Sequence, residues 1–429
     1  MKIFEFSAIV IIMIFFISIT NSFSKIYIEK NVLIEEKEEF ILQNITYVDI
    51  STDGNKMLFS DSQTGVISQF DYNSGVLLNK LNPSLVLSDL VAQSKAKPFK
   101  TMEQKGTKII ERTDWKFISL LEEGKINPGK INEETLKDLI NNIYCISKYY
   151  NNGIISLANI NVPKISNPFD FVHIQTATEF FKFDNKIQHI KVFPLQQENK
   201  DVPPLPTANN FCIFHNYYYV TTLDAGRYLL FKKNDSLPIL AVYDKNGNFI
   251  KIKRYLPYLY DFSNLGYLLT DNSLLLETDN EDIYSSFWFV DYIDFLNKSY
   301  KIRLKGLPYA NKSMFNKLKL YCEKKGSFDI EYYEIHKFLP LMIKNLIPVH
   351  KQIAVLSTLN EVKKQEYFIS KYFLQLYNKS GELVKQDTIS NINNNGALQY
   401  VTYNNKKNKL LIFRKSNEKG WTMEVTKWE

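Results

Sequence analysis

The residues best suited to bind a metal ion in this sequence are the acidic stretch from Asp279 to Asp282. Its side chains supply only oxygen ligands, which are the ligands that calcium prefers. The stretch lacks the spaced ligands and the glycine of an EF-hand loop, so a solvated acidic loop is the simpler interpretation. We therefore predict neither a metal site nor a cofactor, and calcium is the one ion left open.

The sequence contains few motifs that would indicate catalysis. We find no G-x-S-x-G or H-E-x-x-H motif. Residues 124–131 approach a phosphate-binding loop, but Ile131 stands where that motif needs Ser or Thr. We predict His215 and His350 in turns at the end of the fold opposite His173, so a three-histidine centre is not expected. The five histidines are dispersed and the sequence predicts no catalytic residue; they are His173, His189, His215, His336 and His350.

The distribution of charged residues bears on the class of partner. The 53 basic and 46 acidic residues are interleaved without a long block of one sign, so we predict no nucleic-acid partner.

Lys2 precedes an apolar run from Ala8 to Ile19, and small polar residues follow it, as in a secretory signal peptide at residues 1–24. An uncleaved anchor is the alternative, although this run is short of the ~20 residues that span a bilayer. We expect a periplasmic or extracellular mature chain, residues 25–429, without a membrane span.

The three cysteines are widely spaced and form no C-x-x-C pair, which argues against a zinc or redox site. Cys145 and Cys212 lie in apolar runs that resemble strands, so buried free thiols are the simplest interpretation. Export would permit one disulfide. No feature selects a pair among Cys145, Cys212 and Cys322.

The elements that must position any site form a repeat. An aromatic residue, an Asp or Asn, a polar turn and a β-prone run recur at 70–78, 243–250 and 377–384, with weaker copies at 183–187 and 292–299. Glycine supplies the positive φ of such turns, and Asp or Asn caps its own backbone. A second type of hairpin is predicted at 47–60, 143–158, 211–222, 265–278, 346–358 and 398–414. Two hairpins in series make a four-stranded blade, strands A to D.

We therefore predict an all-β fold, a six-bladed β-propeller. The last unit lacks its D strand, which the segment Lys25 to Glu29 can supply, closing the ring and covering an exposed edge. Two insertions, about 84–137 and 306–343, do not follow the blade pattern. The first includes an expected short helix at 132–140, and the second is ambiguous between helix and strand.

Residues 44–81 resemble the repeats of exported bacterial six-bladed propellers. The stretch 49–60 is similar to TolB-type repeats, and 60–71 is similar to NHL-type repeats. This resemblance implies a binding or scaffolding role. Some six-bladed propellers are calcium-dependent lactonases, which makes a lactonase or esterase-type hydrolase at the channel mouth the alternative function.

Chain direction predicts where a ligand would bind. The two insertions connect strand D of one blade to strand A of the next, and the long loops 161–178 and 223–238 connect strands B and C. Both kinds of connection emerge at the same end of a blade, so the insertions and the long loops share that end. Long structured loops often carry function. We expect a protein or glycan partner at this end, although the insertions could instead only cap the channel. The candidate ligand-binding residues are Phe169, Phe171, His173, Arg227, Tyr228, Asp279, Glu281, Asp282 and Tyr284.

Overall fold

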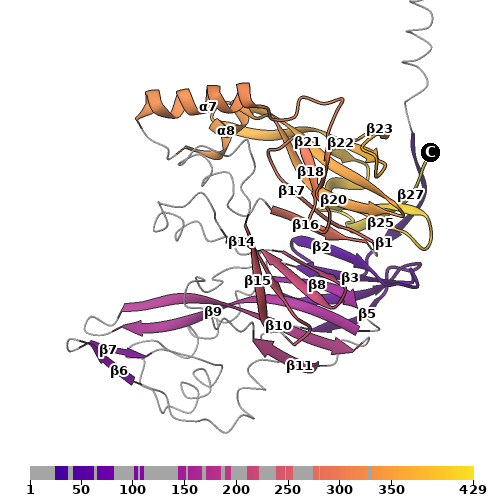
Figure 1. The fold of residues 1–429 in the computed structure, drawn as a ribbon. Helices are drawn as coiled ribbons and strands as arrows, with labels where there is room; N and C mark the ends of the chain where they lie inside the picture. The colour runs from indigo at the N-terminus through magenta and orange to yellow at the C-terminus, as the bar shows by residue number, and fades with distance from the viewer. Residues whose placement is uncertain are drawn as a thin grey trace, which may run out of the picture. The chain divides into compact units, whose positions relative to one another are not determined.

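In the computed structural model, the described residues form β-strands and two helices (Figure 1). Within this part of the chain, no helix is long and apolar enough to cross a membrane. The leader, residues 1–24, lies outside the described residues. The described residues are 25–36, 42–61, 65–81, 101–104, 107–110, 144–150, 153–166, 171–184, 189–194, 210–221, 238–246, 248–254, 274–279, 281–326 and 330–429.

The strands pair into six antiparallel sheets, numbered here in chain order. The first contains β2 (Ile45–Ile50), β3 (Lys56–Asp61), β4 (Ile67–Asp71) and β5 (Leu77–Leu81). The second contains β8 (Tyr144–Tyr150), β9 (Gly153–Ser166), β10 (Phe171–Asp184) and β11 (His189–Pro194). The third contains β12 (Phe211–Phe214), β13 (Tyr217–Thr221), β14 (Pro238–Tyr243) and β15 (Phe249–Arg254).

The fourth sheet contains β16 (Leu274–Thr278), β17 (Ile283–Phe287), β18 (Tyr292–Phe295) and β19 (Tyr300–Arg303). The fifth contains β20 (Leu341–Val349), β21 (Gln352–Lys363), β22 (Glu366–Tyr377) and β23 (Leu383–Ile389). The sixth contains β24 (Ile392–Asn393), β25 (Gly396–Asn404), β26 (Lys409–Ser416), β27 (Gly420–Trp428) and β1 (Ile26–Leu33). Successive strands are neighbours in each of these sheets, which is the blade topology of an all-β propeller.

The chain divides into two compact units, and each is described by itself. The first three sheets belong to one unit, in which β8 contacts β2 and β3. The last three sheets and most of β1 belong to the other unit, in which β20 contacts both β16 and β25. The first and second sheets are therefore neighbours in one unit, and the fifth sheet lies between the fourth and the sixth in the other. Apolar residues of the fifth and sixth sheets pack into a shared core that includes Ile347, Leu374, Val401 and Ile412.

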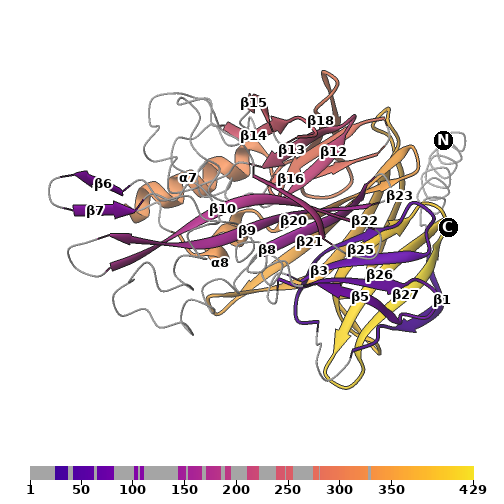
Figure 2. The same ribbon diagram turned by 90° about the horizontal axis from the view of Figure 1, so that it is seen from below.

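The predicted N-terminal strand is present in the sixth sheet, where β1 pairs with β27 (Figure 2). Lys25 N–H donates to the carbonyl of Glu429 over 3.1 Å, and Glu429 N–H donates back to Lys25 over 3.2 Å. The amide of Asn395 also donates to Asn31 over 3.2 Å. This strand covers an edge of β27 that would otherwise present unpaired backbone groups.

The predicted turn chemistry is confirmed at the hairpins between the third and fourth strands of the sheets. Asp71 Oδ1 accepts from the backbone N–H groups of Asn73 and Ser74 at 3.0 and 2.8 Å. Gly75 has a φ of 73°, which a residue with a side chain rarely adopts. In the fifth sheet, Asn378 Oδ1 likewise accepts from the backbone of Glu382 over 2.9 Å.

The second sheet differs from the expected loop at 161–178. Most of that segment is strand, because β9 and β10 each run for 14 residues and stay paired out to Phe171 and Ser166. Two strands of the first insertion, β6 (Thr101–Gln104) and β7 (Thr107–Ile110), extend this sheet through a pairing of Ile109 with Ser166. The expected helix at 132–140 lies outside the described residues.

The second insertion forms two helices, α7 (Lys312–Lys325) and α8 (Tyr332–Phe338). Asn311 caps α7, since its side chain accepts from Met314 N–H over 3.1 Å. Gly326 ends the helix with a φ of 69°. Cys322 on α7 is a buried free thiol, and Cys212 on β12 is also buried, whereas the side chain of Cys145 lies outside the described residues.

Candidate functional site

The structure describes some of the predicted ligand-binding residues and not others. Phe169, Arg227 and Tyr228 lie outside the described residues. Phe171 and His173 lie on β10, where their backbones pair with Ser166 and Lys164 of β9. These two positions belong to a strand of the second sheet rather than to the expected loop.

The acidic turn, defined here as Asp279, Glu281 and Asp282, lies at the opposite end of its sheet from the predicted one. The predicted hairpin at 265–278 puts it between the second and third strands, but it joins β16 to β17, the first and second strands. The reason is a shift of one strand: the run after 271–272 is the first strand of the described sheet, whereas the predicted hairpin makes it the second. Tyr284, the second residue of β17, is moved with the turn.

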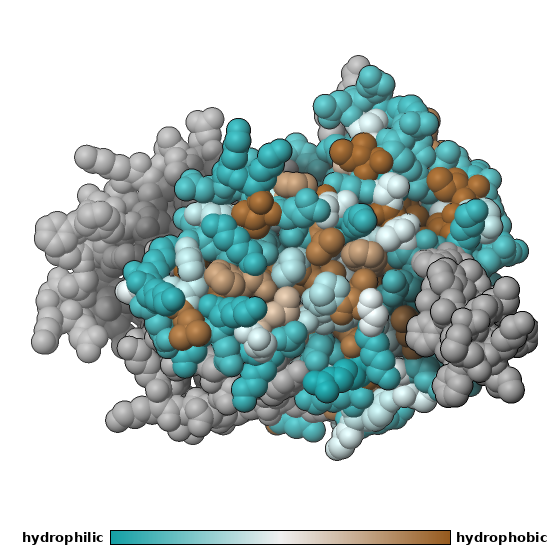
Figure 3. Space-filling view, turned by 90° about the horizontal axis from the view of Figure 1, so that it is seen from above, coloured by the Kyte–Doolittle hydropathy of each residue, from teal (hydrophilic) through white to brown (hydrophobic). Residues whose placement is uncertain are grey.

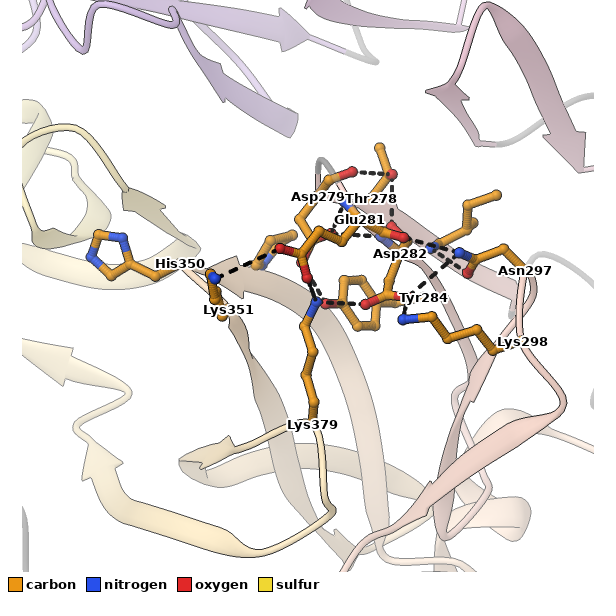
Figure 4. Close-up of polar contacts among 12 residues, drawn as sticks. Thr278, Asp279, Glu281, Asp282, Tyr284, Asn297, Lys298, His350, Lys351 and Lys379 are labelled. Carbon is orange, nitrogen blue, oxygen red and sulfur yellow. Dashed lines mark hydrogen bonds and ion pairs between the residues drawn. The ribbon is translucent and has the colours of Figure 1, made fainter.

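Asp279 organises this turn through its carboxylate (Figure 4). One oxygen accepts from the backbone N–H groups of Glu281 and Asp282, both at 2.7 Å. The other accepts from the hydroxyl of Tyr284 at 2.5 Å. Burial first, and then this bond to Asp279, raise the pKa of Tyr284. The predicted residues are thus brought together, but their contacts with one another shape the turn.

Lysines from neighbouring turns occupy the remaining carboxylate oxygens (Figure 4). The fully buried carboxylate of Asp282 pairs with Lys298 and with Lys379, whose amine lies 2.5 Å away. Lys379 also reaches Glu281 over 2.7 Å, and Lys351 approaches Glu281 at 3.9 Å. Burial alone would raise the pKa of Asp282, but the hydrogen bonds from the two lysines outweigh it and lower that pKa.

This arrangement is an ion-pair junction between the fourth and fifth sheets. Burial alone would lower the pKa of Lys379, but its bonds to Asp282 and Glu281 raise it to about 12. Three carboxylates meet three lysines, so a calcium ion would have to displace ammonium groups to bind here. Among the described residues, no group of three His, Cys, Asp or Glu side chains could hold a metal ion.

A second cluster lies at the end of the unit that carries α7 and α8, and sequence reasoning missed it. We call Trp288, Tyr332 and Tyr367 the aromatic row. The ring centroids of Trp288 and Tyr332 are 6.3 Å apart, and those of Tyr332 and Tyr367 are 5.3 Å apart. Trp288 and Tyr332 are partly exposed, and Tyr367 is 40% exposed. The three rings come from the turn between β17 and β18, from α8 and from β22.

The aromatic row is held in place by backbone and ionic contacts. Ile343 N–H donates to the carbonyl of Trp288 over 2.8 Å, which ties the turn of the fourth sheet to β20. The carboxylate of Glu334 on α8 accepts from Tyr321 of α7 and from Lys325, at 2.9 Å for the lysine. These bonds, with the Tyr321 hydroxyl foremost, lower the pKa of Glu334 to about 2. The insertion was predicted at 306–343, and the caps of α7 are the sequence signals that could have identified it as helical.

His336 is the buried centre of this cluster. Its side chain is 2% exposed, and its ring contacts Tyr332, Tyr367 and Phe289. Nδ1 lies 3.2 Å from the carbonyl of Leu339 and 3.2 Å from the amide nitrogen of Asn360. A single ring nitrogen cannot donate to the first and accept from the second at once. Nε2 has no partner in the described part of the chain, and burial lowers the pKa of His336 to about 4.

The surface seen from above in Figure 1, over α7 and its neighbours, is mainly hydrophilic (Figure 3). Apolar residues occur on it in small groups between polar ones. Leu320 of α7 is an exposed apolar side chain of the kind that ordinary surfaces carry.

Comparisons with known proteins give only distant similarities. No protein-family model matches the sequence, and no curated protein matches it. Among solved structures, a Bacteroides fragilis protein thought to be exported has 8% identity and a TM-score of 0.48, over 94% of this chain and 95% of that one. The β-propeller domain of Myceliophteria thermophila Cps50 (Swd1) has 9% identity and a TM-score of 0.38, over 94% and 99%. Similarities of this size assign no family, and the resemblance to NHL-type and TolB-type repeats stays a prediction.

Proposed function

We propose that this chain is an exported binding or scaffold propeller without catalytic activity, whose six sheets are the blades of one ring. The signal-like residues 1–24 support export. The pairing of β1 with β27 supports ring closure by an N-terminal strand, since it completes the last sheet. In this proposal the end that carries α7 and α8 recognises a protein or a glycan outside the cytoplasm.

The observation that carries the proposal is the aromatic row. Three rings from three separate elements meet at one end of the unit and remain accessible to solvent. Partly exposed aromatic side chains beside charged ones are typical of recognition surfaces. The acidic turn, by contrast, has its carboxylates engaged by lysines, as at a structural junction.

The binding surface can be tested with matched tyrosine variants of residues 25–429. Tyr367→Ala removes a ring of the row, and Tyr217→Ala removes a similarly exposed ring, at 40% and 43% exposure respectively. We expect Tyr367→Ala to weaken binding of ligands selected on a glycan array or by envelope capture by at least about fivefold, as for an interface anchor. Tyr217→Ala should retain binding. Equal behaviour of the two variants would contradict the proposal.

Export can be tested separately by cell fractionation and mass spectrometry of the N-terminus. Cleavage after Ser22 or Ser24 should give a mature chain that begins at Phe23 or Lys25, found in the periplasm or the medium. A full-length chain retained in the cytoplasm would contradict this part of the proposal.

A further inference from the structure

The residue that says most about the ligand is Lys344, on the first strand of the fifth sheet. Along β20, Ile343 pairs with Ser357 and Asn345 pairs with Leu356, so Lys344 has no opposite residue on β21. This extra residue is a β-bulge, a device that re-aims a side chain and often lies beside functional sites. The Asn345 amide donates to the carbonyl of Val401 on β25 over 3.2 Å, which anchors the strand immediately after the bulge.

Lys344 is an exposed residue whose amine is nevertheless partly desolvated by the surrounding protein. This desolvation lowers the pKa of the amine. Among the described residues, no carboxylate forms an ion pair with Lys344. The amine lies over the ring of Trp288, 5.8 Å from its centroid. Nearby Lys325, in contrast, is paired with Glu334.

These features specify a ligand chemistry. A partly desolvated cation that no described carboxylate pairs with gains most from an anionic group that forms charge-assisted hydrogen bonds. The adjoining rings of Trp288 and Tyr332 offer a partly exposed aromatic surface that suits a flat apolar face. An acidic sugar carries a carboxylate and an apolar ring face a few atoms apart. An acidic peptide side chain carries its carboxylate on a flexible stem without such a face.

We propose that Lys344 and the aromatic row bind an acidic sugar residue of a glycan, with the carboxylate on Lys344 and the sugar ring on Trp288. This inference rests on the proposed binding function and names its ligand class. It requires the ammonium and the rings to act together, so both kinds of variant must weaken binding.

The test uses oligogalacturonate as the probe, with neutral galactan and poly-glutamate for comparison, by calorimetry on residues 25–429. Lys344→Gln should weaken oligogalacturonate binding at least tenfold, and Trp288→Leu should weaken it as well. Lys363→Gln, at an exposed lysine of β21, is the matched control and should change binding less than twofold. Galactan should bind weakly to all of these proteins.

Three results would overturn the proposal: no binding of oligogalacturonate, equal binding by Lys344→Gln, or tight poly-glutamate binding that Trp288→Leu leaves unchanged. The last result would assign Lys344 to an acidic peptide. An independent readout is the NMR titration of the Lys344 amine, whose pKa should rise when oligogalacturonate is added. The ligand could instead be a neutral glycan or a protein whose binding depends on Tyr367 but not on Lys344. That result would contradict this inference, while the proposed function would remain supported.

Discussion

Acidification should weaken the attachment of α8 because His336 is buried in its neutral form. An unfolded histidine has a pKa of about 6.5, whereas burial lowers that of His336 to about 4. Between these two pH values the unfolded chain binds a proton that the folded chain does not. The free energy of unfolding therefore decreases as the pH falls through this window and levels off below it.

The size of the effect follows from the shift. Each pH unit within the window removes at most about 1.4 kcal/mol, so the whole window removes on the order of 3 kcal/mol. The neighbouring pair of Lys325 and Glu334 does not contribute to this change, because the pKa of Glu334 is about 2 and its carboxylate stays charged throughout the window. The charge of Lys344 also disfavours protonation of His336.

The assay compares the chain with a His336→Asn variant, which cannot titrate. The asparagine amide occupies the place of Nδ1 and can keep the hydrogen bond to the carbonyl of Leu339. Urea unfolding and hydrogen exchange of residues 330–338 would be measured between about pH 7 and pH 4, across the window set by the two pKa values. The original chain should lose more stability and more exchange protection than the variant. Parallel pH curves would refute the idea that His336 is buried and neutral.

Three further outcomes are expected. Glu424→Gln should lower the unfolding free energy by about 3–5 kcal/mol, because it strands the buried Arg414, 3.0 Å away. Asp294→Asn, in a half-exposed pair with Lys301, should cost less than about 1 kcal/mol. Similar urea midpoints of the two variants would contradict this. Gly396→Ala should cost at least about 2 kcal/mol in the same assay, since φ is 110° and a Cβ would lie 2.2 Å from a backbone oxygen; a near-neutral effect would be inconsistent with this geometry. Calcium should leave the melting temperature unchanged because lysines hold Asp282, and a rise reversed by chelator would show that the ion displaces them.

The hairpins were predictable because their signals are local. A turn such as that at Asp71 needs only side chains and backbone within a few residues, and all of them stand in the printed sequence. The pairing of β1 with β27 was predictable for a related reason, since the last unit was one strand short. The acidic turn was assigned to the wrong end because strand order within a blade depends on which apolar run pairs, which alternation does not encode.

The sequence by itself therefore determined the β-rich repeat, the turns and the N-terminal closing strand. Only the tertiary structure decided the chemistry of the candidate site. The aromatic row joins rings from a turn, an inserted helix and a hairpin that are up to 79 positions apart in the chain, between Trp288 and Tyr367. Lys344 gained its exposure and its lowered pKa from a bulge and from the atoms around it. Such properties arise from three-dimensional proximity and desolvation, and the spacing of residues along the sequence predicts neither of them.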